Sequence, residues 1–553
     1  MRPHSFILAA ALGLATITAA PSSSAFCGFY VAGADEKLFN NATMVVLMRE
    51  GTRTVLSMQN NYQGPPENFA MVVPVPVVLQ KENVKTLSME IFDKVDKLAS
   101  PRLVEYWEQD PCAPPIQDMP RSAVFGAVPM AEEEDRSEGG TGVKIEAQFT
   151  VGEYEVVILS ARDSLGLDTW LRQEKYKIPE GSEPLLRPYV QGGSKFFVAK
   201  VNAKKVRFQN GMAQLSPLRF HYDSETFALP VRLGLVNSAG TQDLIVHILA
   251  RGQRYETANY PNVAIPTNLD VKDSVRKNFG AFYAALFDRT VERNPRAVIT
   301  EYAWDASTCD PCPGPALEQD DFLTLGEDVI NEMQIAGASE GAAPTSMVVG
   351  QGIAVPSRQW SSAGGYVITR LHVRYGKDGL GEDLVFRTAQ PIVGGREFLN
   401  EGKTIETGAV KSEINNFQAR YAIRHPWTGP ITCDKPQRGI WGGPPGTYGK
   451  PPAAAAQNLA FAPREGASLT AMVARDDNET KIDSAPLVPA PPMFRAAPGS
   501  PGFGVSPRSG GCAGCRVGDT NEGMVPVGAT IATAIGAAAV RMLRKKNRSN
   551  ARD

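Results

Sequence analysis

Pairs of β-rich segments that flank a glycine turn are the strongest constraint on how this chain of 553 residues can fold. Runs of β-branched and aromatic residues joined by a short glycine turn are typical of β-hairpins. Such pairs predict antiparallel sheets. They occur at 44–48 with 54–59, 143–150 with 153–160, 227–237 with 242–250, and 367–375 with 384–388.

Helical periodicity is less common and occurs in segments 86–99, 167–174, 271–291 and 322–334. Helices and strands do not alternate strictly, which argues against a doubly wound parallel sheet. We therefore predict an α+β fold that is β-rich, with antiparallel sheets and a few helices.

A repeated order of residues predicts an internal duplication, with chance similarity as the alternative. The first copy reads Ile91-Phe92-Asp93-Lys94, Pro101-Arg102, Glu105-Tyr106-Trp107 and Asp110-Pro111-Cys112. The second copy reads Leu286-Phe287-Asp288-Arg289, Pro295-Arg296, Glu301-Tyr302, Trp304 and Asp310-Pro311-Cys312. If the unit is duplicated, Phe92 and Phe287 occupy equivalent buried helix positions. Trp107 and Trp304 then lie in corresponding segments.

The N-terminal segment is typical of a secretory signal peptide. Arg2 supplies the positive charge, 6–20 is apolar, and small residues at 23–25 precede the expected cleavage point. The apolar run is shorter than the roughly 20 residues that span a membrane. We predict a signal peptide over 1–25 and a mature chain that begins at Phe26, with an uncleaved anchor as the alternative.

The C-terminal region has four successive parts. A linker rich in Pro, Gly and Ala covers 436–511, and Cys512 and Cys515 follow it. Next come an apolar stretch, 524–543, and a basic cluster, 544–548. The apolar stretch is long enough to cross a membrane, and the basic cluster favours a cytoplasmic C-terminus. The alternative is a buried amphipathic helix.

This order of linker, cysteine motif, apolar stretch and basic tail resembles the C-terminal sorting signals of myxobacterial-type surface proteins. The resemblance covers 512–553. It implies export and sorting machinery as partners, with sorting or lipidation at Cys512 or Cys515. It also implies retention at the cell envelope or surface, with the tail cytoplasmic before any processing.

The body between these ends is mildly acidic. Residues 1–25 carry one positive charge and 524–553 carry a net +5, so a total of −2 leaves −8 on residues 26–523. That charge excludes the basic footprint of a nucleic-acid-binding protein. On length we predict two β-rich lobes, 26–215 and 216–435, ahead of the linker at 436–511 and the tail at 512–553.

Histidines and acidic residues offer one weak candidate metal site. His221, Asp223 and Glu225 alternate along one predicted strand, which would place them on the same face. A polar strand face is the simpler interpretation. His247 and His372 alternate with apolar residues, so we interpret both as core or sheet-surface histidines.

Cysteines are the richest chemical class, with seven in the chain and five in the body. Export permits disulfides, and Cys309 and Cys312 have the spacing of redox motifs. The prolines that follow them disfavour a helix start, so we interpret this segment as a structural turn. Cys112 ends the other copy of the repeat and is the expected disulfide partner of this pair.

The order of motifs in the body resembles the bacterial family catalogued as domain of unknown function 2330. The resemblance is carried by CGFY (27–30), FAMVVPVP (69–76), SPLRFHYDSETFALPVRLG (216–234), CDPCPGP (309–315), TRLHVRYGKDGLGEDLVF (369–386) and FQARYAIRHPW (417–427). The family implies an exported or envelope-attached protein and no activity.

These patterns together favour a non-enzymatic binding or scaffold module at the envelope. We expect no cofactor, and the ligand stays open. Enzymatic activity also stays open: the alternative is an envelope enzyme, either a thiol–disulfide or a metal-assisted hydrolytic one, whose site no motif displays.

Overall fold

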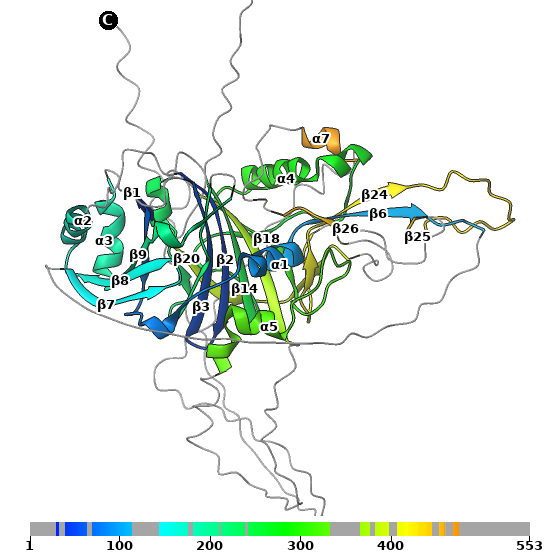
Figure 1. Ribbon diagram of the computed structural model, residues 1–553. Coiled ribbons are helices and arrows are strands. Elements are labelled where there is room, and N and C mark those ends of the chain that lie inside the picture. Colours follow the sequence, from blue (N-terminus) through cyan, green and yellow to red (C-terminus); the bar gives the residue numbers. More distant parts are fainter. Residues whose placement is uncertain are drawn as a thin grey trace, which may run out of the picture. The chain divides into compact units, whose positions relative to one another are not determined.

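A mixed sheet of eleven strands forms the centre of the part of the chain that the structure describes (Figure 1). The computed structural model describes residues 29–32, 39–63, 69–112, 143–174, 181–209, 212–237, 242–331, 365–375, 382–396, 406, 408–444, 453–457, 459 and 468–474. Across the sheet the order is β22 (Val410–Lys411), β21 (Ile392–Gly394), β23 (Asn416–Gln418), β18 (Val298–Asp305), β19 (Tyr366–Tyr375), β14 (Gln242–Arg251), β2 (Phe39–Glu50), β3 (Arg53–Gln63), β12 (Leu218–Asp223) and β5 (Val84–Thr86), with β16 (Asn262–Ala264) beside β18. Strands from both predicted lobes, 26–215 and 216–435, therefore lie in one sheet.

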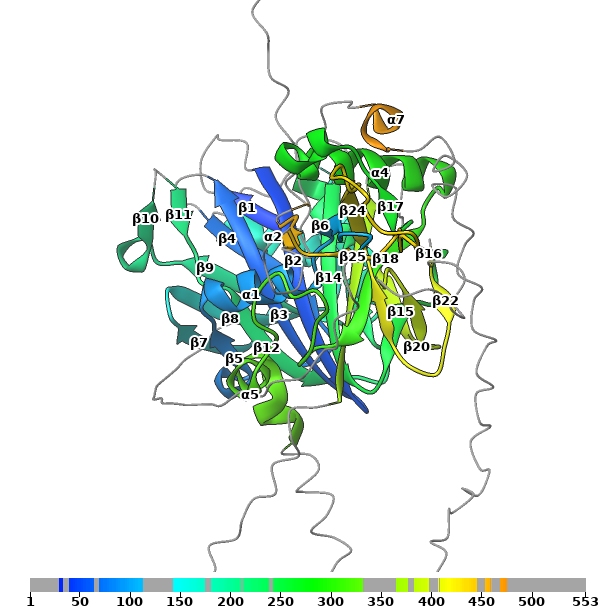
Figure 2. The same ribbon diagram turned by 90° about the vertical axis from the view of Figure 1, so that its right-hand side faces the viewer.

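A second sheet packs on one face of the central sheet. Its order is β1 (Phe29–Ala32), β4 (Phe69–Val75), β9 (Lys195–Val201), β8 (Tyr154–Ala161) and β7 (Val143–Val151), as Figure 2 shows. Val45 and Leu47 of β2 share one apolar core with Val73, Ile158 and Phe197 of this sheet. Burial of alternate residues from both sheets stabilises the contact.

Helices cover the outer face of the second sheet. α2 (Ser164–Gln173) and α3 (Glu183–Gln191) place Leu167, Leu171 and Leu186 against Val72 and Val198. Asp163 caps α2, because its carboxylate accepts a hydrogen bond from the amide of Gly166.

Two further helices, α1 (Met89–Ala99) and α4 (Phe279–Arg293), lie on the free face of the central sheet (Figure 1). Successive strand residues alternate between faces, so Ile245 and Leu249 of β14 point the same way. Ile245 shares a core with Phe282 of α4, and Leu249 shares a core with Phe92 of α1. The layers are therefore helix, sheet, sheet and helix.

A smaller sheet begins directly after α1. β6 (Arg102–Glu108) pairs in parallel with β24 (Arg420–His425), and the two run side by side in Figure 1. Strands β17 (Leu269–Asp270), β25 (Trp441–Gly442) and β26 (Ala453–Ala455) complete it. Trp107 stacks on His425 with ring centroids 4.6 Å apart. Within this sheet, β6 leads from the end of α1 toward Cys112.

The remaining elements are short. β13 (Ala228–Leu229), β20 (Leu384–Ala389) and β15 (Arg254–Thr257) form a three-stranded sheet, and β10 (Arg207–Gln209) pairs with β11 (Met212–Gln214). Helices α5 (Gln319–Phe322) and α7 (Leu469–Met472) each have a single turn.

The α+β prediction is confirmed, and so are two of the predicted hairpins. β2 pairs with β3 and β7 pairs with β8, both antiparallel. Gly51 and Gly152 occupy the turns with φ of 54° and 55°, a region that L residues rarely adopt. Local turn chemistry therefore determines both pairings.

The other two predicted hairpins are wrong. The segment 227–237 stops being a strand at Pro230, and a 3₁₀ helix follows over Arg232–Asn237. β14 pairs instead with β19 and, in parallel, with β2. β19 and β20 are strands as predicted, but they pair with other partners. The sheets are thus mixed.

The predicted helices are present with shifted ends. α1 begins at Met89, after the cap at Ser88, and α4 begins at Phe279, after a short 3₁₀ helix over Asp273–Lys277. In the segment 322–334, α5 leads into a π-helical turn over Leu323–Glu327. α3 was not predicted, because its two prolines weaken the helical pattern.

Both copies of the repeat form a helix followed by a strand. α1 precedes β6 and α4 precedes β18. Phe92 and Phe287 are both fully buried, while Trp107 lies in β6 and Trp304 in β18, as predicted. β6 pairs in parallel with β24, whereas β18 pairs antiparallel with β19. Duplication of this unit stays a hypothesis.

Candidate functional site

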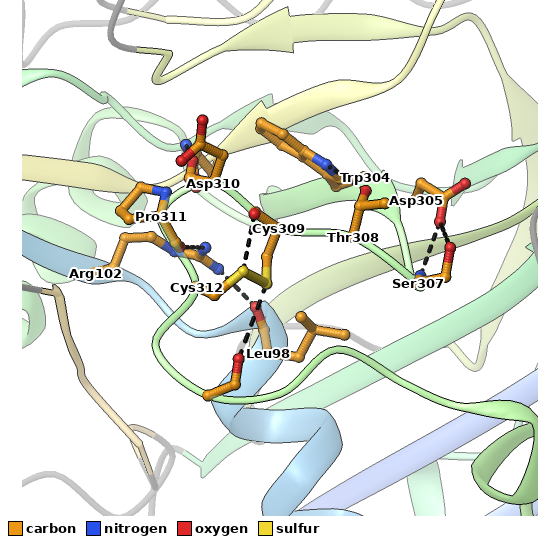
Figure 3. Close-up of a disulfide and its surroundings, with 12 residues drawn as sticks. Leu98, Arg102, Trp304, Asp305, Ser307, Thr308, Cys309, Asp310, Pro311 and Cys312 are labelled. Atoms are coloured by element: carbon orange, nitrogen blue, oxygen red, sulfur yellow. Dashed lines mark hydrogen bonds between the residues drawn. A yellow bond between two sulfur atoms is a disulfide. The ribbon is translucent and has the colours of Figure 1, made fainter. Parts of the chain in front are cut away.

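The loop after β18 carries a disulfide between Cys309 and Cys312, with 4.9 Å between the Cα atoms (Figure 3). The turn that leads into it is held by side chains. Asp305 accepts hydrogen bonds from the amide and hydroxyl of Ser307, and Trp304 donates to the hydroxyl of Thr308 at 3.1 Å. The disulfide therefore has a defined place at the end of the strand.

The two sulfur atoms have different surroundings. Cys312 is exposed, whereas Cys309 is half-buried and packs against the apolar core beneath α1. The Sγ atom of Cys312 lies 2.8 Å from the carbonyl oxygen of Cys309. Solvent thus reaches the disulfide from the side of Cys312.

Arg102 connects the disulfide loop with the end of α1 (Figure 3). Its fully buried guanidinium donates to the carbonyl of Pro311 at 2.8 Å and to that of Leu98 at 2.6 Å. It also lies 5.1 Å from the ring centroid of Tyr302. Burial lowers the pKa of Arg102. The arginine satisfies a carbonyl at the C-terminal end of α1 and ties the loop to that end.

An open cleft of about 450 Å³ lies beside this loop on the exposed side of α1. It is lined by Asp93, Lys94, Lys97, Pro315 and Gln457. A Cβ atom added to Gly314 would lie 3.0 Å from the Cδ of Lys97, so the lysine chain runs along this glycine. Burial, with Asp96 and Glu90 nearby, raises the pKa of Asp93.

A second group of polar side chains lies between α1 and α4, and we call it the Arg370 cluster. Its members are Asp96, His247, Tyr283, Glu301, Arg370 and His372. The Nε of Arg370 donates to Glu301 at 2.6 Å, and the same guanidinium binds Asp96. Tyr283 of α4 donates to Glu301 at 2.5 Å, and a ring nitrogen of His372 lies 2.6 Å from it.

Neighbouring groups in this cluster fix the ionisation states of Glu301 and His247. Burial alone would raise the pKa of Glu301, but His372 and Arg370 outweigh it and lower that pKa to about 2. Burial and the charge of Arg370 lower the pKa of His247 well below its usual range. The cluster therefore pairs its charges internally and links the two helices through the sheet.

A protein-family model described as "Uncharacterized protein conserved in bacteria (DUF2330)" matches residues 21–387. The chain belongs to this family. The part that matches DUF2330 contains α1, α4, the Arg370 cluster and the Cys309–Cys312 loop, and it ends before the run at 417–427. No curated protein and no solved structure matches the chain.

Within the DUF2330 body, the candidate metal ligands do not come together around one point. Asp223 forms an ion pair with Arg53 at 3.0 Å, and His221 lies 3.0 Å from the side-chain nitrogen of Asn83. Burial, followed by Arg53, lowers the pKa of His221 to about 4. Glu225 is exposed beyond the end of β12. In the described ranges no group of three His, Cys, Asp or Glu is placed to hold a metal ion.

The disulfide pairing differs from the expected one. Cys112 bonds to Cys433 rather than to Cys309 or Cys312, with 5.6 Å between the Cα atoms. The parallel pairing of β6 with β24 directs both strands to the same end, which places Cys112 and Cys433 together. The sequence repeat predicted a bond from Cys112 to Cys309 or Cys312. It gave no indication that β6 pairs with β24.

His247 and His372 are core histidines, as predicted, because both are buried. Arg102 and Arg370 were missed. The alternation in TRLHVRY (369–375) would have placed Arg370 and His372 on one face, but it could not show what covers that face.

Several predictions fall outside the described residues. They concern the signal peptide, Cys512, Cys515, and the apolar stretch 524–543. Among the residues that the structure does describe, no helix is both long and apolar enough to cross a membrane.

Proposed function

We propose that this protein is exported and held at the cell envelope, where it acts as a non-enzymatic binding or scaffold module. The observation that carries the proposal is the disulfide between Cys112 and Cys433, which are separated by 321 positions. Disulfides form and persist in exported proteins and are rare in the reducing cytosol. The signal-like segment 1–25 points to the same compartment.

The Arg370 cluster supports a module rather than an enzyme. Glu301, Arg370 and His372 are at most 1% exposed, and they bind one another and the flanking helices. Catalytic groups must reach a substrate, whereas these charges hold α1 and α4 on the sheet. The cluster thus serves a rigid scaffold.

Attachment is proposed for the C-terminal region. In this proposal β25, β26 and α7 belong to the body, because they pair with β6 or pack on the core beside α4. The rest of the predicted linker, 475–511, separates the body from the membrane, and the stretch at 524–543 spans it. The cluster at 544–548 stays cytoplasmic, because Lys and Arg oppose translocation. Cys512 or Cys515 is then the point at which sorting machinery processes or lipidates the chain.

Cell fractionation tests the proposal. We expect the full chain in the envelope fraction, and a chain that ends at Pro507 in the medium or periplasm. Peptide mapping without reductant checks the disulfide in the same samples, and a peptide that joins Cys112 to Cys433 is expected. A cytosolic protein with both of these thiols free would contradict the proposal.

N-terminal sequencing of the envelope fraction tests the export step separately. A mature chain that begins at Phe26 is expected from the small residues at 23–25. An intact Met1 on envelope protein would refute cleavage. The attachment of the C-terminal region is tested separately, by the chain that ends at Pro507.

A further inference from the structure

The two disulfides close loops of very different length. Cys112–Cys433 closes a loop of 321 positions, whereas Cys309–Cys312 spans three. A disulfide stabilises mainly by restricting the unfolded chain, and a very short loop restricts it least. The short disulfide is therefore expected to contribute less to stability than the long one, although it lies at an exposed and well-supported position.

The surroundings of the sulfur atoms define one direction of attack. A thiolate from solvent reaches the Sγ of the exposed Cys312, and the half-buried Cys309 is then the leaving sulfur. If both sulfur atoms were equally exposed to solvent, a thiolate could attack either one first. The difference in exposure therefore predicts which mixed disulfide forms first.

A buried cation lies next to the cysteine that is attacked. Arg102 donates to the carbonyl of Pro311, the residue directly before Cys312. Its guanidinium donates to the backbone carbonyls of Leu98, Ser100 and Pro311, and Tyr302 and Asp310 also interact with its charge. Nearby arginine favours the thiolate form of cysteine.

The cleft beside the loop offers charges of both signs. Asp93 and Lys97 lie one helical turn apart on α1, and neither forms an ion pair within the described residues. Gln457 adds an amide. The volume of about 450 Å³ lies within the usual range for small-molecule sites. Lys97 lies along Gly314, two residues after Cys312, and this contact places the cleft beside the disulfide.

We propose that the Cys309–Cys312 disulfide exchanges with a small thiol that carries both an ammonium and a carboxylate group, held in this cleft. Lys97 binds the carboxylate and Asp93 binds the ammonium. The substrate thiolate attacks the Sγ of Cys312, a new S–S bond forms there, and the bond to Cys309 breaks. Cys309 leaves as a thiolate and takes up a proton.

A second thiol completes the exchange. Its thiolate attacks the substrate sulfur of the mixed disulfide and releases the thiolate of Cys312. Two thiols are thereby oxidised to one disulfide, and the protein disulfide is reduced to two thiols. The reaction is stoichiometric and needs no other oxidant.

Reaction of the oxidised full chain with cysteine, compared with 2-mercaptoethanol, tests the proposal. Each rate is divided by the rate of the same thiol with a synthetic disulfide peptide of residues 307–316, which removes differences in intrinsic reactivity. Alkylation followed by mass mapping locates the product. We expect the mixed disulfide on Cys312 and a preference for cysteine of about tenfold, the size of one charge-assisted contact.

Matched variants separate the cleft from general charge effects. Lys97→Gln and Asp93→Asn should each bring the preference for cysteine close to that of the peptide. Lys144→Gln removes an equal charge on the exposed strand β7 and should leave the preference unchanged. Cys112–Cys433 should stay oxidised throughout and so reports an intact fold.

Three results would overturn the proposal. They are a preference equal to that of the peptide, a first product on Cys309, and a preference that survives both cleft variants. None of them depends on where the protein resides in the cell, so this test can fail while the envelope proposal stands.

Discussion

At the scale of single residues, Glu301 and Arg370 place two opposite charges in the interior, and each charge is neutralised by the other. Both are fully buried, and each has a further partner, Tyr283 for Glu301 and Asp96 for Arg370. A buried charge is tolerated when it is paired and hydrogen-bonded, and removal of one partner exposes the cost of burying the other. The cluster is thus sensitive to any single change.

Glu301→Gln tests this dependence. The variant keeps the shape of the side chain but leaves Arg370 with less negative charge, so we expect the free energy of unfolding at pH 7 to fall by about 3 kcal/mol. Urea titration measures it. Glu225→Gln changes an exposed carboxylate and is expected to leave the midpoint unchanged.

The same residue predicts a pH dependence. The pKa of Glu301 is about 2 in the folded state, below its usual value of 4.5. The unfolded chain therefore binds more protons, and the stabilisation is complete above about pH 4.5 and is lost as the pH falls toward 2. Urea titrations between pH 2 and 6 should show a shallower acid slope for Glu301→Gln. Equal slopes would contradict the assignment.

At the scale of elements, α1 and α4 perform the same task at two positions on one sheet face. Each helix buries a phenylalanine and sends one polar side chain to the Arg370 cluster, Asp96 from α1 and Tyr283 from α4. The cluster therefore couples two helices that do not share an apolar core.

Truncation of the two phenylalanines compares the helices directly. Phe92→Ala and Phe287→Ala should each lower the free energy of unfolding by about 3–5 kcal/mol, because each leaves a cavity in a fully packed core. Glu90→Ala on the exposed side of α1 is the control. A loss confined to one helix would count against the equivalence of the two units.

Local elements could be predicted from the sequence, and distant pairings could not. The hairpins at Gly51 and Gly152 follow from turns within a few residues. The neighbours of β14 depend instead on strands more than 100 residues away, β2 and β19, and no local pattern names them. The same reason separates the Cys309–Cys312 motif, visible as spacing, from Arg102, whose contact with Pro311 spans 209 positions.

At the scale of the whole molecule, the two disulfides should differ in their effect on stability. In the loop-entropy relation a loop of 321 positions contributes about 6 kcal/mol and a four-residue ring about 2 kcal/mol. We therefore expect Cys112→Ser with Cys433→Ser to lower the melting temperature much more than Cys309→Ser with Cys312→Ser. Calorimetry of both double variants decides, and equal losses would show that the short disulfide also has a structural role.

The Cys112–Cys433 bond also determines how the molecule carries mechanical load. If the chain is held at its C-terminal end and pulled from its N-terminal end, tension passes from β6 through the disulfide into the segment after Cys433. The 321 positions between the two cysteines lie outside the load path, so α4 and β18 do not carry the tension. α1 precedes Cys112 and therefore does carry it. Reduction would release roughly 1,100 Å of extra contour length, at about 3.5 Å per residue.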